Sequence, residues 1–109
     1  MKSEVYFADE KIREAYKKLS KGKSEDRMIY EWISNALSKI EENAFSGIQI
    51  KKSLIPKIYI KKYGIKNLWK YNLPQGWRLL YSLTDEGIVL ISIILEWLPH
   101  KEYEKRFSY

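Results

Sequence analysis

Cysteine is absent from the 109-residue sequence, and histidine occurs only once, as His100. The first absence excludes disulfide bonds, a thiol nucleophile and a Cys-ligated zinc site, and a single histidine excludes a metal site built from several imidazoles. No run of about 18 apolar residues occurs, so no membrane span is expected. Residues 1–10 lack the apolar core of a secretory signal. We therefore expect a cytoplasmic protein.

Acidic residues are missing from a long central stretch. Residues 43–84 carry seven lysines and one arginine but no Asp or Glu, a net charge of +8, whereas residues 1–42 sum to zero and residues 85–109 sum to −2. These three sums return the net charge of +6 of the whole chain. A segregated positive field attracts polyanions such as nucleic acids. A lysine-rich surface that only keeps the protein soluble would leave the same pattern, so both interpretations stay open.

Apolar side chains are plentiful enough for a real core. Hydrophobic residues make up 45% of the chain and include four Trp, nine Tyr and three Phe. A chain of this length has room for one hydrophobic core. We therefore expect a single domain that spans residues 1–109.

The first part of the chain predicts a strand followed by a helical hairpin. Residues 3–7 are rich in aromatic and β-branched side chains and predict a strand. Asp9 is expected to cap a helix over residues 10–20, where apolar residues recur at helical spacing. Ser24 is expected to cap a second helix that runs to about Ala44. The short connection between the helices predicts an antiparallel pair.

The next segment, residues 46–67, has no clear periodicity, because Pro56 and Gly64 interrupt it. Its stretch KIYIKKY, residues 57–63, is compatible with a short strand, an irregular loop or one turn of helix. The segment also carries six of the seven central lysines.

Three closely spaced strands are predicted after it, over residues 68–74, 77–83 and 88–97. The turns between them are PQG and TDEG, and Gly87 in the second turn can adopt a positive φ angle. Such short connections make an antiparallel meander. The expected fold class is α+β, a helical hairpin packed on a small twisted antiparallel sheet in the order β-α-α-β-β-β, with a short C-terminal tail or helix.

Alternation along the three strands separates an apolar face from a polar one. The apolar set is expected to cover the helices: Trp69, Tyr71, Leu73, Trp77, Leu79, Tyr81, Leu83, Val89, Ile91, Ile93, Leu95 and Trp97. The other face is expected to be wetted by solvent, and it gathers five polar side chains: Lys70, Arg78, Ser82, Ser92 and Glu96.

Three residues near the end of this region are candidates for chemistry, and each has a structural alternative. Arg78 is one of only four arginines, and its guanidinium can grip a phosphate or pair with Glu96 across the sheet. His100 can exchange a proton near neutral pH or be an incidental exposed histidine. Tyr103 can stack on a nucleobase or tether the C-terminal tail to the sheet.

The segments LWKYNLPQGWRLLYSL (68–83) and ISIILEWLPHKEYEKRF (91–107) resemble the RelE/ParE superfamily of toxins from type II toxin–antitoxin systems. The resemblance implies a ribosome-dependent mRNA endoribonuclease that requires no metal or other cofactor. The ribose 2′-OH attacks the adjacent phosphate and leaves a 2′,3′-cyclic phosphate and a free 5′-OH. It also implies that a small acidic antitoxin protein covers the basic sheet and tail, and that no membrane is involved. His100 and Tyr103 favour the RelE-like mRNA interferase branch.

The resemblance assigns roles to five residues in catalysis. Arg78 matches the phosphate-clamping strand arginine, His100 the C-terminal catalytic histidine, and Tyr103 the tyrosine that stacks on or positions a base. Lys70 lies on the strand that supplies basic residues, and Glu96 is an alternative base. The expected RNA-binding residues are Lys61, Lys62, Lys66, Lys101 and Arg106, of which Lys101 or Arg106 could supply a second positive group at the phosphate.

Two departures from the family pattern keep other functions open. Asn72 stands where a second basic residue is expected, and Glu102 and Glu104 make the tail partly acidic. The superfamily also contains gyrase-inhibiting relatives that lack the nuclease residues. A non-catalytic relative on the same fold, or a basic module that binds nucleic acid or protein, is therefore the alternative.

Overall fold

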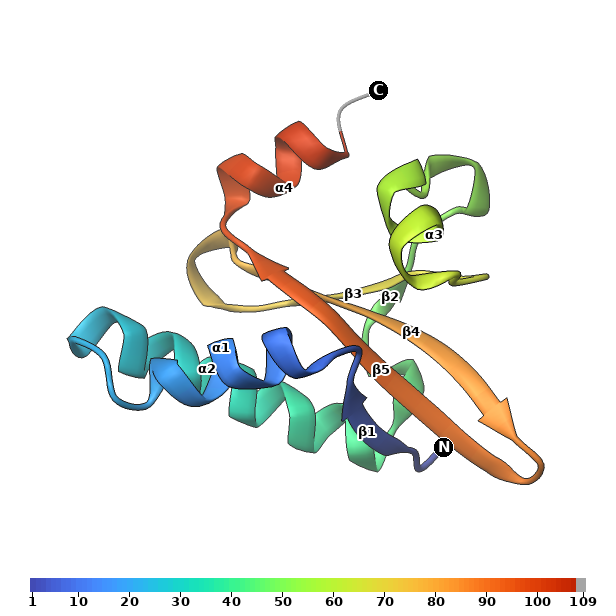
Figure 1. Cartoon of the computed structure of the whole chain (residues 1–109), viewed down its shortest axis with the longest axis horizontal. Coiled ribbons are helices and arrows are strands. Elements are labelled where there is room, and N and C mark those ends of the chain that lie inside the picture. Colours follow the sequence, from blue (N-terminus) through green and yellow to red (C-terminus); the bar gives the residue numbers. More distant parts are fainter. Residues whose placement is uncertain (108–109) are drawn as a thin grey trace.

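A five-stranded sheet lies between two pairs of helices in the computed structural model, which describes residues 1–107 (Figure 1). Ser108 and Tyr109, the end of the predicted tail, lie outside the described residues. The main elements are β1 Glu4–Phe7, α1 Glu10–Leu19, α2 Ser24–Glu42, β2 Ile48–Gln49, α3 Lys57–Tyr63, β3 Trp69–Asn72, β4 Arg78–Glu86, β5 Val89–Leu98 and α4 His100–Arg106. Three 3-10 turns join them at Ala44–Ser46, Lys52–Leu54 and Pro74–Gly76.

The strand order is β1-β5-β4-β3-β2. Strands β2 to β5 pair antiparallel, whereas β1 pairs parallel with β5, so the sheet is mixed. The predicted α+β class, with its first strand, helical hairpin and three-stranded meander, is confirmed. Within residues 1–107, no helix is both long enough and apolar enough to cross a membrane.

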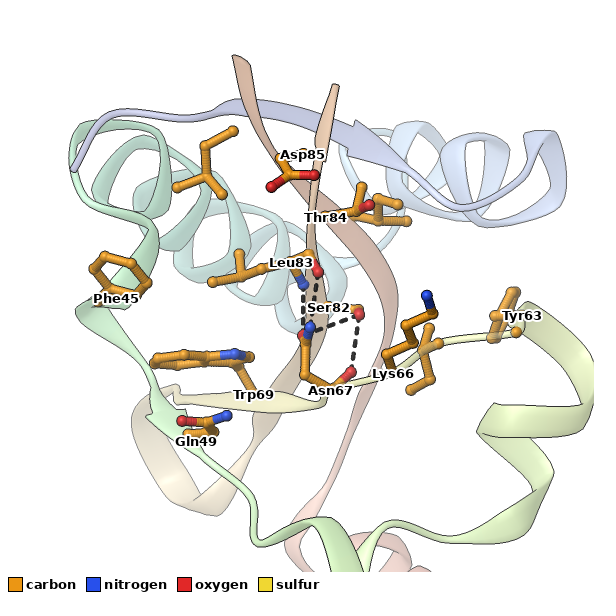
Figure 2. A pocket seen from close by; sticks show the side chains of 14 residues that line it. Phe45, Gln49, Tyr63, Lys66, Asn67, Trp69, Ser82, Leu83, Thr84 and Asp85 are labelled. Carbon is orange, nitrogen blue, oxygen red and sulfur yellow. Dashed lines mark hydrogen bonds between the residues drawn. The ribbon is translucent and has the colours of Figure 1, made fainter. Parts of the chain in front are cut away.

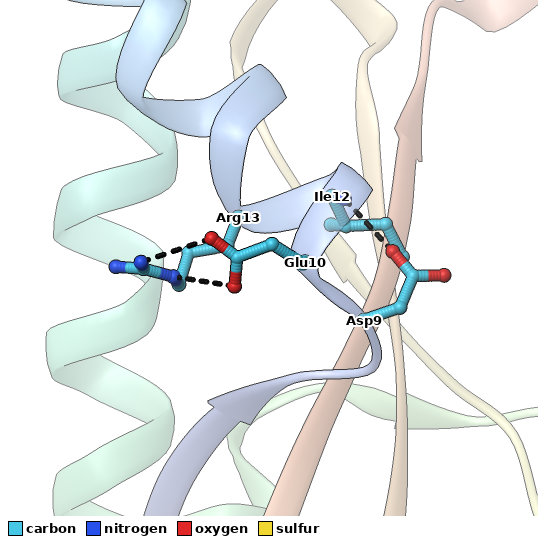
Figure 3. Close-up of polar contacts among 4 residues, drawn as sticks. All are labelled: Asp9, Glu10, Ile12 and Arg13. Carbon is cyan, nitrogen blue, oxygen red and sulfur yellow. Dashed lines mark hydrogen bonds and ion pairs between the residues drawn. The ribbon is translucent and has the colours of Figure 1, made fainter.

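The cap predicted for the first helix is confirmed. The Asp9 side chain accepts a hydrogen bond from the Ile12 backbone N–H at 2.9 Å, which satisfies one of the free donors at the start of α1 (Figure 3). One residue further, Glu10 pairs with Arg13 through two hydrogen bonds of 3.0 and 3.1 Å on the exposed side of the helix.

The boundaries of α2 differ slightly from the prediction. Ser24 is the first residue of the helix rather than its cap, and Lys23 at the cap position makes no side-chain hydrogen bond. The helix ends at Glu42, before the expected Ala44, because Asn43 is extended. The Asn43 side chain instead accepts from the Phe45 N–H at 3.1 Å and caps the following 3-10 turn.

The ambiguous stretch KIYIKKY forms the seven-residue helix α3. Its end is set by Gly64, which has a φ of 63° and donates its N–H to the Ile60 carbonyl at 2.9 Å. The turn predicted at TDEG is displaced, since β4 continues to Glu86 and the chain reverses at the two residues Gly87 and Ile88. Gly87 has the positive φ expected of it, 64°.

A β-bulge in β5 overturns part of the predicted face assignment. Leu80 pairs with Glu96 but its neighbour Tyr81 pairs with Ile94, so Leu95 is an extra residue in β5. The residues of β5 before the bulge therefore change faces. The prediction that Leu95 and Ile93 cover the helical hairpin is wrong, because both residues pack on the opposite side of the sheet.

The predicted position of Ser92 on the wetted face is also wrong. It lies on the face of the helical hairpin, fully buried, and its hydroxyl bonds that of Ser3 at 2.8 Å. For β3, β4 and Trp97 the predicted apolar face is correct, because these residues contribute to the core beneath α1 and α2.

The predicted wetted face is largely covered. Helices α3 and α4 pack on it, and Figure 1 shows them on the side of the sheet opposite to α1 and α2. This second core consists of Ile50, Ile55, Tyr59, Leu68, Leu80, Leu95, Leu98 and Phe107. Ser82 is buried here as well, where its hydroxyl bonds the Asn67 carbonyl.

Tyr81 provides a test of this architecture. Its ring is buried, and its hydroxyl donates to the Ala44 carbonyl at 2.8 Å and accepts from the Gly47 N–H at 3.0 Å. Tyr81→Phe leaves both groups without this partner, so we expect the free energy of unfolding in urea to fall by about 1–3 kcal/mol. Tyr6→Phe, which removes an exposed hydroxyl from β1, is the control and should change it by less than about 0.5 kcal/mol. Equal losses in the two variants would contradict this account.

Candidate functional site

Two predicted cations meet the predicted tyrosine beneath α4. The Lys70 Nζ lies 5.2 Å from the centroid of the Tyr103 ring, and the Arg78 Cζ lies 5.1 Å from it. Phe107 stacks on the same ring with a centroid distance of 4.4 Å. An aromatic ring attracts cations through its quadrupole, so Tyr103 favours two positive charges side by side. We call these residues, Lys70, Arg78 and Tyr103, together with His100 three residues before Tyr103 on α4, the Tyr103 cluster.

The sheet sets the direction of the two cations. Lys70 lies opposite Leu80, and Arg78 lies opposite Asn72. Side chains directly opposite one another in paired strands share a face, and residues two positions apart on one strand do too. Lys70 and Arg78 therefore rise from neighbouring strands on the side where α4 packs.

Arg78 has no acidic partner among residues 1–107. Its Nη1 donates to the Gly76 carbonyl at 2.5 Å, and its Nε is buried without an acceptor. Within residues 1–107 no ion pair joins it to a carboxylate, so the alternative pair with Glu96 is wrong. A buried donor left unsatisfied costs about 1–3 kcal/mol. The guanidinium is thus a positive charge that no carboxylate within residues 1–107 neutralises, and its Nε is a buried donor without a partner.

Glu96 forms an ion pair with Arg106 instead. The Arg106 Nη1 donates to the Glu96 carboxylate at 2.6 Å and to the Tyr59 hydroxyl at 2.8 Å, and these contacts join β5, α3 and α4. Burial, followed by the neighbouring Glu96, raises the pKa of Tyr59 well above its ordinary value of 10.0. The carboxylate predicted as an alternative base and the arginine predicted to bind RNA therefore neutralise each other.

His100 begins α4 and lies against the turn that precedes β4. Its side chain is about half exposed, and its Nε2 contacts the carboxylate of Glu104 one helical turn later. Gly76 makes this placement possible, since a Cβ atom built on Gly76 would stand 2.9 Å from the His100 Cβ and 3.7 Å from Nδ1. The Gly76 carbonyl also accepts from Arg78, so a side chain at position 76 would crowd His100 at the same residue that binds the guanidinium.

The other predicted RNA-binding residues take no part in the contacts of the Tyr103 cluster. Lys61 and Lys62 lie on α3, Lys101 lies on α4, and Lys66 lies between α3 and β3, all with exposed side chains. The Lys62 Nζ lies 5.3 Å from the Tyr63 ring. Both helices stand on one side of the sheet, so these charges add to the positive field around Tyr103.

A cavity with a volume of about 680 Å³ lies elsewhere, at the start of β3 (Figure 2). None of the five predicted catalytic residues lines it, whereas Lys66 does. Among residues 1–107, no group of three His, Asp or Glu side chains is placed to hold a metal ion.

Three residues of the site were not identified from the sequence. Glu104 was noted only as a departure, although its spacing of four from His100 predicts contact on a helix. Gly76 was assigned only to a turn. Tyr59 gave no signal, because its contact with Arg106 joins residues 47 positions apart.

Comparisons with protein-family models, with curated proteins and with solved structures found no match to this chain. The expectation of a RelE/ParE toxin, drawn from residues 68–83 and 91–107, therefore stays a prediction.

Tyr59 should make the protein less stable in alkali. Because its pKa is raised in the folded state, the unfolded chain loses the hydroxyl proton first as the pH rises above about 10, and unfolding becomes more favourable. The pKa values of Tyr81 and Tyr16 are raised mainly by burial and add to this decline. We expect Tyr59→Phe to make the fall in unfolding free energy between about pH 9.5 and 11.5 shallower, measured by urea titration at each pH.

The slope is the quantity to compare, because Tyr59→Phe also removes a hydrogen bond from Arg106 and lowers stability at neutral pH. A slope equal to that of the wild type would contradict the burial of an intact Tyr59 hydroxyl.

Proposed function

We propose that this chain is the toxin of a toxin–antitoxin pair and acts as a metal-independent, ribosome-dependent mRNA endoribonuclease of the RelE-like kind. The observation that supports this most directly is the Tyr103 cluster, in which Lys70 and Arg78 converge on Tyr103. His100 lies three residues before Tyr103 on the same helix. The cluster thus combines positive charge for a phosphate, a ring for a base and a group that transfers protons.

The proposed reaction is an internal transfer of the phosphodiester. The ribose 2′ oxygen attacks the adjacent phosphorus, the bond from phosphorus to the 5′ oxygen of the next nucleotide breaks, and a 2′,3′-cyclic phosphate remains. The 2′-hydroxyl proton passes to the enzyme, and the departing 5′ oxygen takes a proton from water. The negative charge that builds on the phosphoryl oxygens is the main barrier that the protein must lower.

Arg78 and Lys70 are assigned to stabilise the negative charge that builds on the phosphoryl oxygens. The planar guanidinium of Arg78 can contact two phosphoryl oxygens at once, and no carboxylate within residues 1–107 neutralises its charge. The Lys70 ammonium lies near the same ring and adds a second positive charge. Arg106 is not assigned this role, because Glu96 neutralises it.

His100 is assigned to accept the 2′-hydroxyl proton. The ring is half exposed, so substrate reaches it without any opening of the fold. Glu104 contacts Nε2 and positions the ring, as a carboxylate does for a catalytic imidazole in many enzymes. Tyr103 is assigned to position the cations and a base beside the scissile phosphate without stacking on it, because Phe107 and the two cations already contact its ring.

The charge distribution supports the proposed partner. Segment 43–84 has no acidic residue, and its exposed lysines gather on α3 and the turns around it. A small acidic antitoxin, partly disordered when free, would cover this surface and the cluster with complementary charge. Ribosomal RNA would meet the same positive field.

Arg78→Ala and His100→Ala test the assigned chemistry. We expect each variant to cleave mRNA on programmed ribosomes about 100-fold or more slowly than the wild type, since one loses charge at the phosphate and the other a proton acceptor. Cut sites and rates are read by primer extension. Arg13→Ala, which removes an exposed arginine paired with Glu10 on α1 (Figure 3), is the control and should cleave normally.

Cleavage by both site variants at the wild-type rate would show that the cluster is not the active site. Growth arrest on expression that persists in both variants, without mRNA cleavage by the wild type, would favour the non-catalytic, gyrase-inhibiting kind of relative.

Gene order provides an independent prediction. We expect a short reading frame for an acidic protein to abut or overlap the one that encodes this chain, because toxin and antitoxin are made together. Co-purification of the two products would confirm the pair. A genome in which the neighbouring frames encode no such protein would favour a basic RNA-binding module.

A further inference from the structure

We propose that the cavity at the start of β3 binds one unpaired nucleotide of an RNA strand, as a subsite separate from the Tyr103 cluster. The inference rests on the proposed function, in that RNA is taken as the substrate. The cavity volume of about 680 Å³ lies in the range of about 300–1,000 Å³ that is usual for small-molecule sites.

Two aromatic rings form one wall of the cavity. Phe45, from the 3-10 turn after α2, and Trp69, from β3, lie with their ring centroids 5.6 Å apart and tilted by 38° (Figure 2). Trp69 is fixed from behind, because Tyr81 stacks on it at 6.1 Å. Phe45 is 48% exposed although it is large and apolar. A fixed ring beside an exposed one is the arrangement on which a nucleobase stacks.

The floor of the cavity is held by Asn67. Its Nδ2 donates to the Leu83 carbonyl at 2.8 Å, and its Oδ1 accepts from the Leu83 N–H at 2.8 Å. The side-chain amide thus takes the place of a strand partner for β4, and Figure 2 shows these bonds among the side chains that line the cavity. Strand pairing stops at Trp69, while β4 continues to Glu86, so the open space lies beside the extended part of β4.

Polar groups at the rim match the parts of a nucleotide. Lys66 is exposed and makes no ion pair with any residue in the range 1–107, so its ammonium is available to a phosphate. Gln49 offers an exposed amide, and Asp85 offers a carboxylate that can accept from an amino group on a base edge. The phosphate would lie on the Lys66 side, because Asp85 repels it.

The surroundings favour a nucleic acid over an uncharged ligand or a peptide. Lys66 continues a run of exposed cations that includes Lys61 and Lys62, in a segment without acidic residues. Strand β5 leads from Ile93 at the cavity to Leu98 before α4, about 16 Å at roughly 3.3 Å per residue. A single strand of a few nucleotides can therefore occupy the cavity and the Tyr103 cluster together.

The test measures RNA binding apart from cleavage. A short, unstructured, fluorescent RNA with 2′-O-methyl groups throughout cannot be cut, since it lacks the attacking hydroxyl, and its affinity is read by fluorescence anisotropy at several salt concentrations. We expect Phe45→Ala to weaken binding about tenfold through lost stacking. Lys66→Ala should weaken it a few-fold and make the salt slope shallower by about 0.7.

Matched controls are available on other faces. Tyr6→Ala removes an aromatic ring of similar exposure from β1, and Lys39→Ala removes an exposed lysine from α2, and both should bind like the wild type. RNA with 5-iodouridine in place of uridine should cross-link under ultraviolet light to the peptides that contain Phe45 or Trp69. Wild-type affinity and salt slope in both cavity variants, or cross-links confined to other peptides, would overturn the subsite.

The two proposals can fail separately. Weakened binding in the cavity variants together with no mRNA cleavage by the wild type would retain the subsite and remove the nuclease. Cleavage that depends on Arg78 and His100, together with unchanged binding in the cavity variants, would retain the nuclease and remove the subsite.

Discussion

The guanidinium of Arg106 is the contact on which the candidate site depends, because it fixes helix α4 to the rest of the molecule. A helix of seven residues is too short to be stable by itself. Its position is set by the bonds from Arg106 to Glu96 and Tyr59 and by the burial of Phe107 in the second core. With α4 fixed in this way, Tyr103 lies where Lys70 and Arg78 can reach its ring.

Two arginines on this side of the sheet have opposite surroundings. Arg106 is neutralised by Glu96 and joins three elements, whereas Arg78 bonds backbone carbonyls, lies over the Tyr103 ring and pairs with no carboxylate within residues 1–107. The ion pair of Arg106 holds elements of the fold together, whereas the charge of Arg78 remains available to a ligand. The fold thus assigns one arginine to structure and leaves the other available for binding.

Much of the fold and part of the site could be predicted from the sequence. Helical spacing of apolar residues located α1 and α2, and alternation placed Lys70 and Arg78 on one face. The bulge at Leu95 could not be predicted, because β5 is apolar on both faces and a shift of one residue leaves no trace in such a pattern. The choice of Arg106 over Arg78 as the partner of Glu96 depends on where α4 packs, which no local pattern specifies.

The parallel pairing of β1 with β5 has a consequence for the order of folding. The first strand of the chain finds its hydrogen-bonding partner only in residues 91–94, so the sheet has a contact that spans most of the sequence. Such contacts slow folding, since a large loop must close before they form. During synthesis β1 stays unpaired until residues 91–94 have been made, and α4 is made later still. A nascent chain of this kind cannot assemble the groups around Tyr103 before α4 itself has been made.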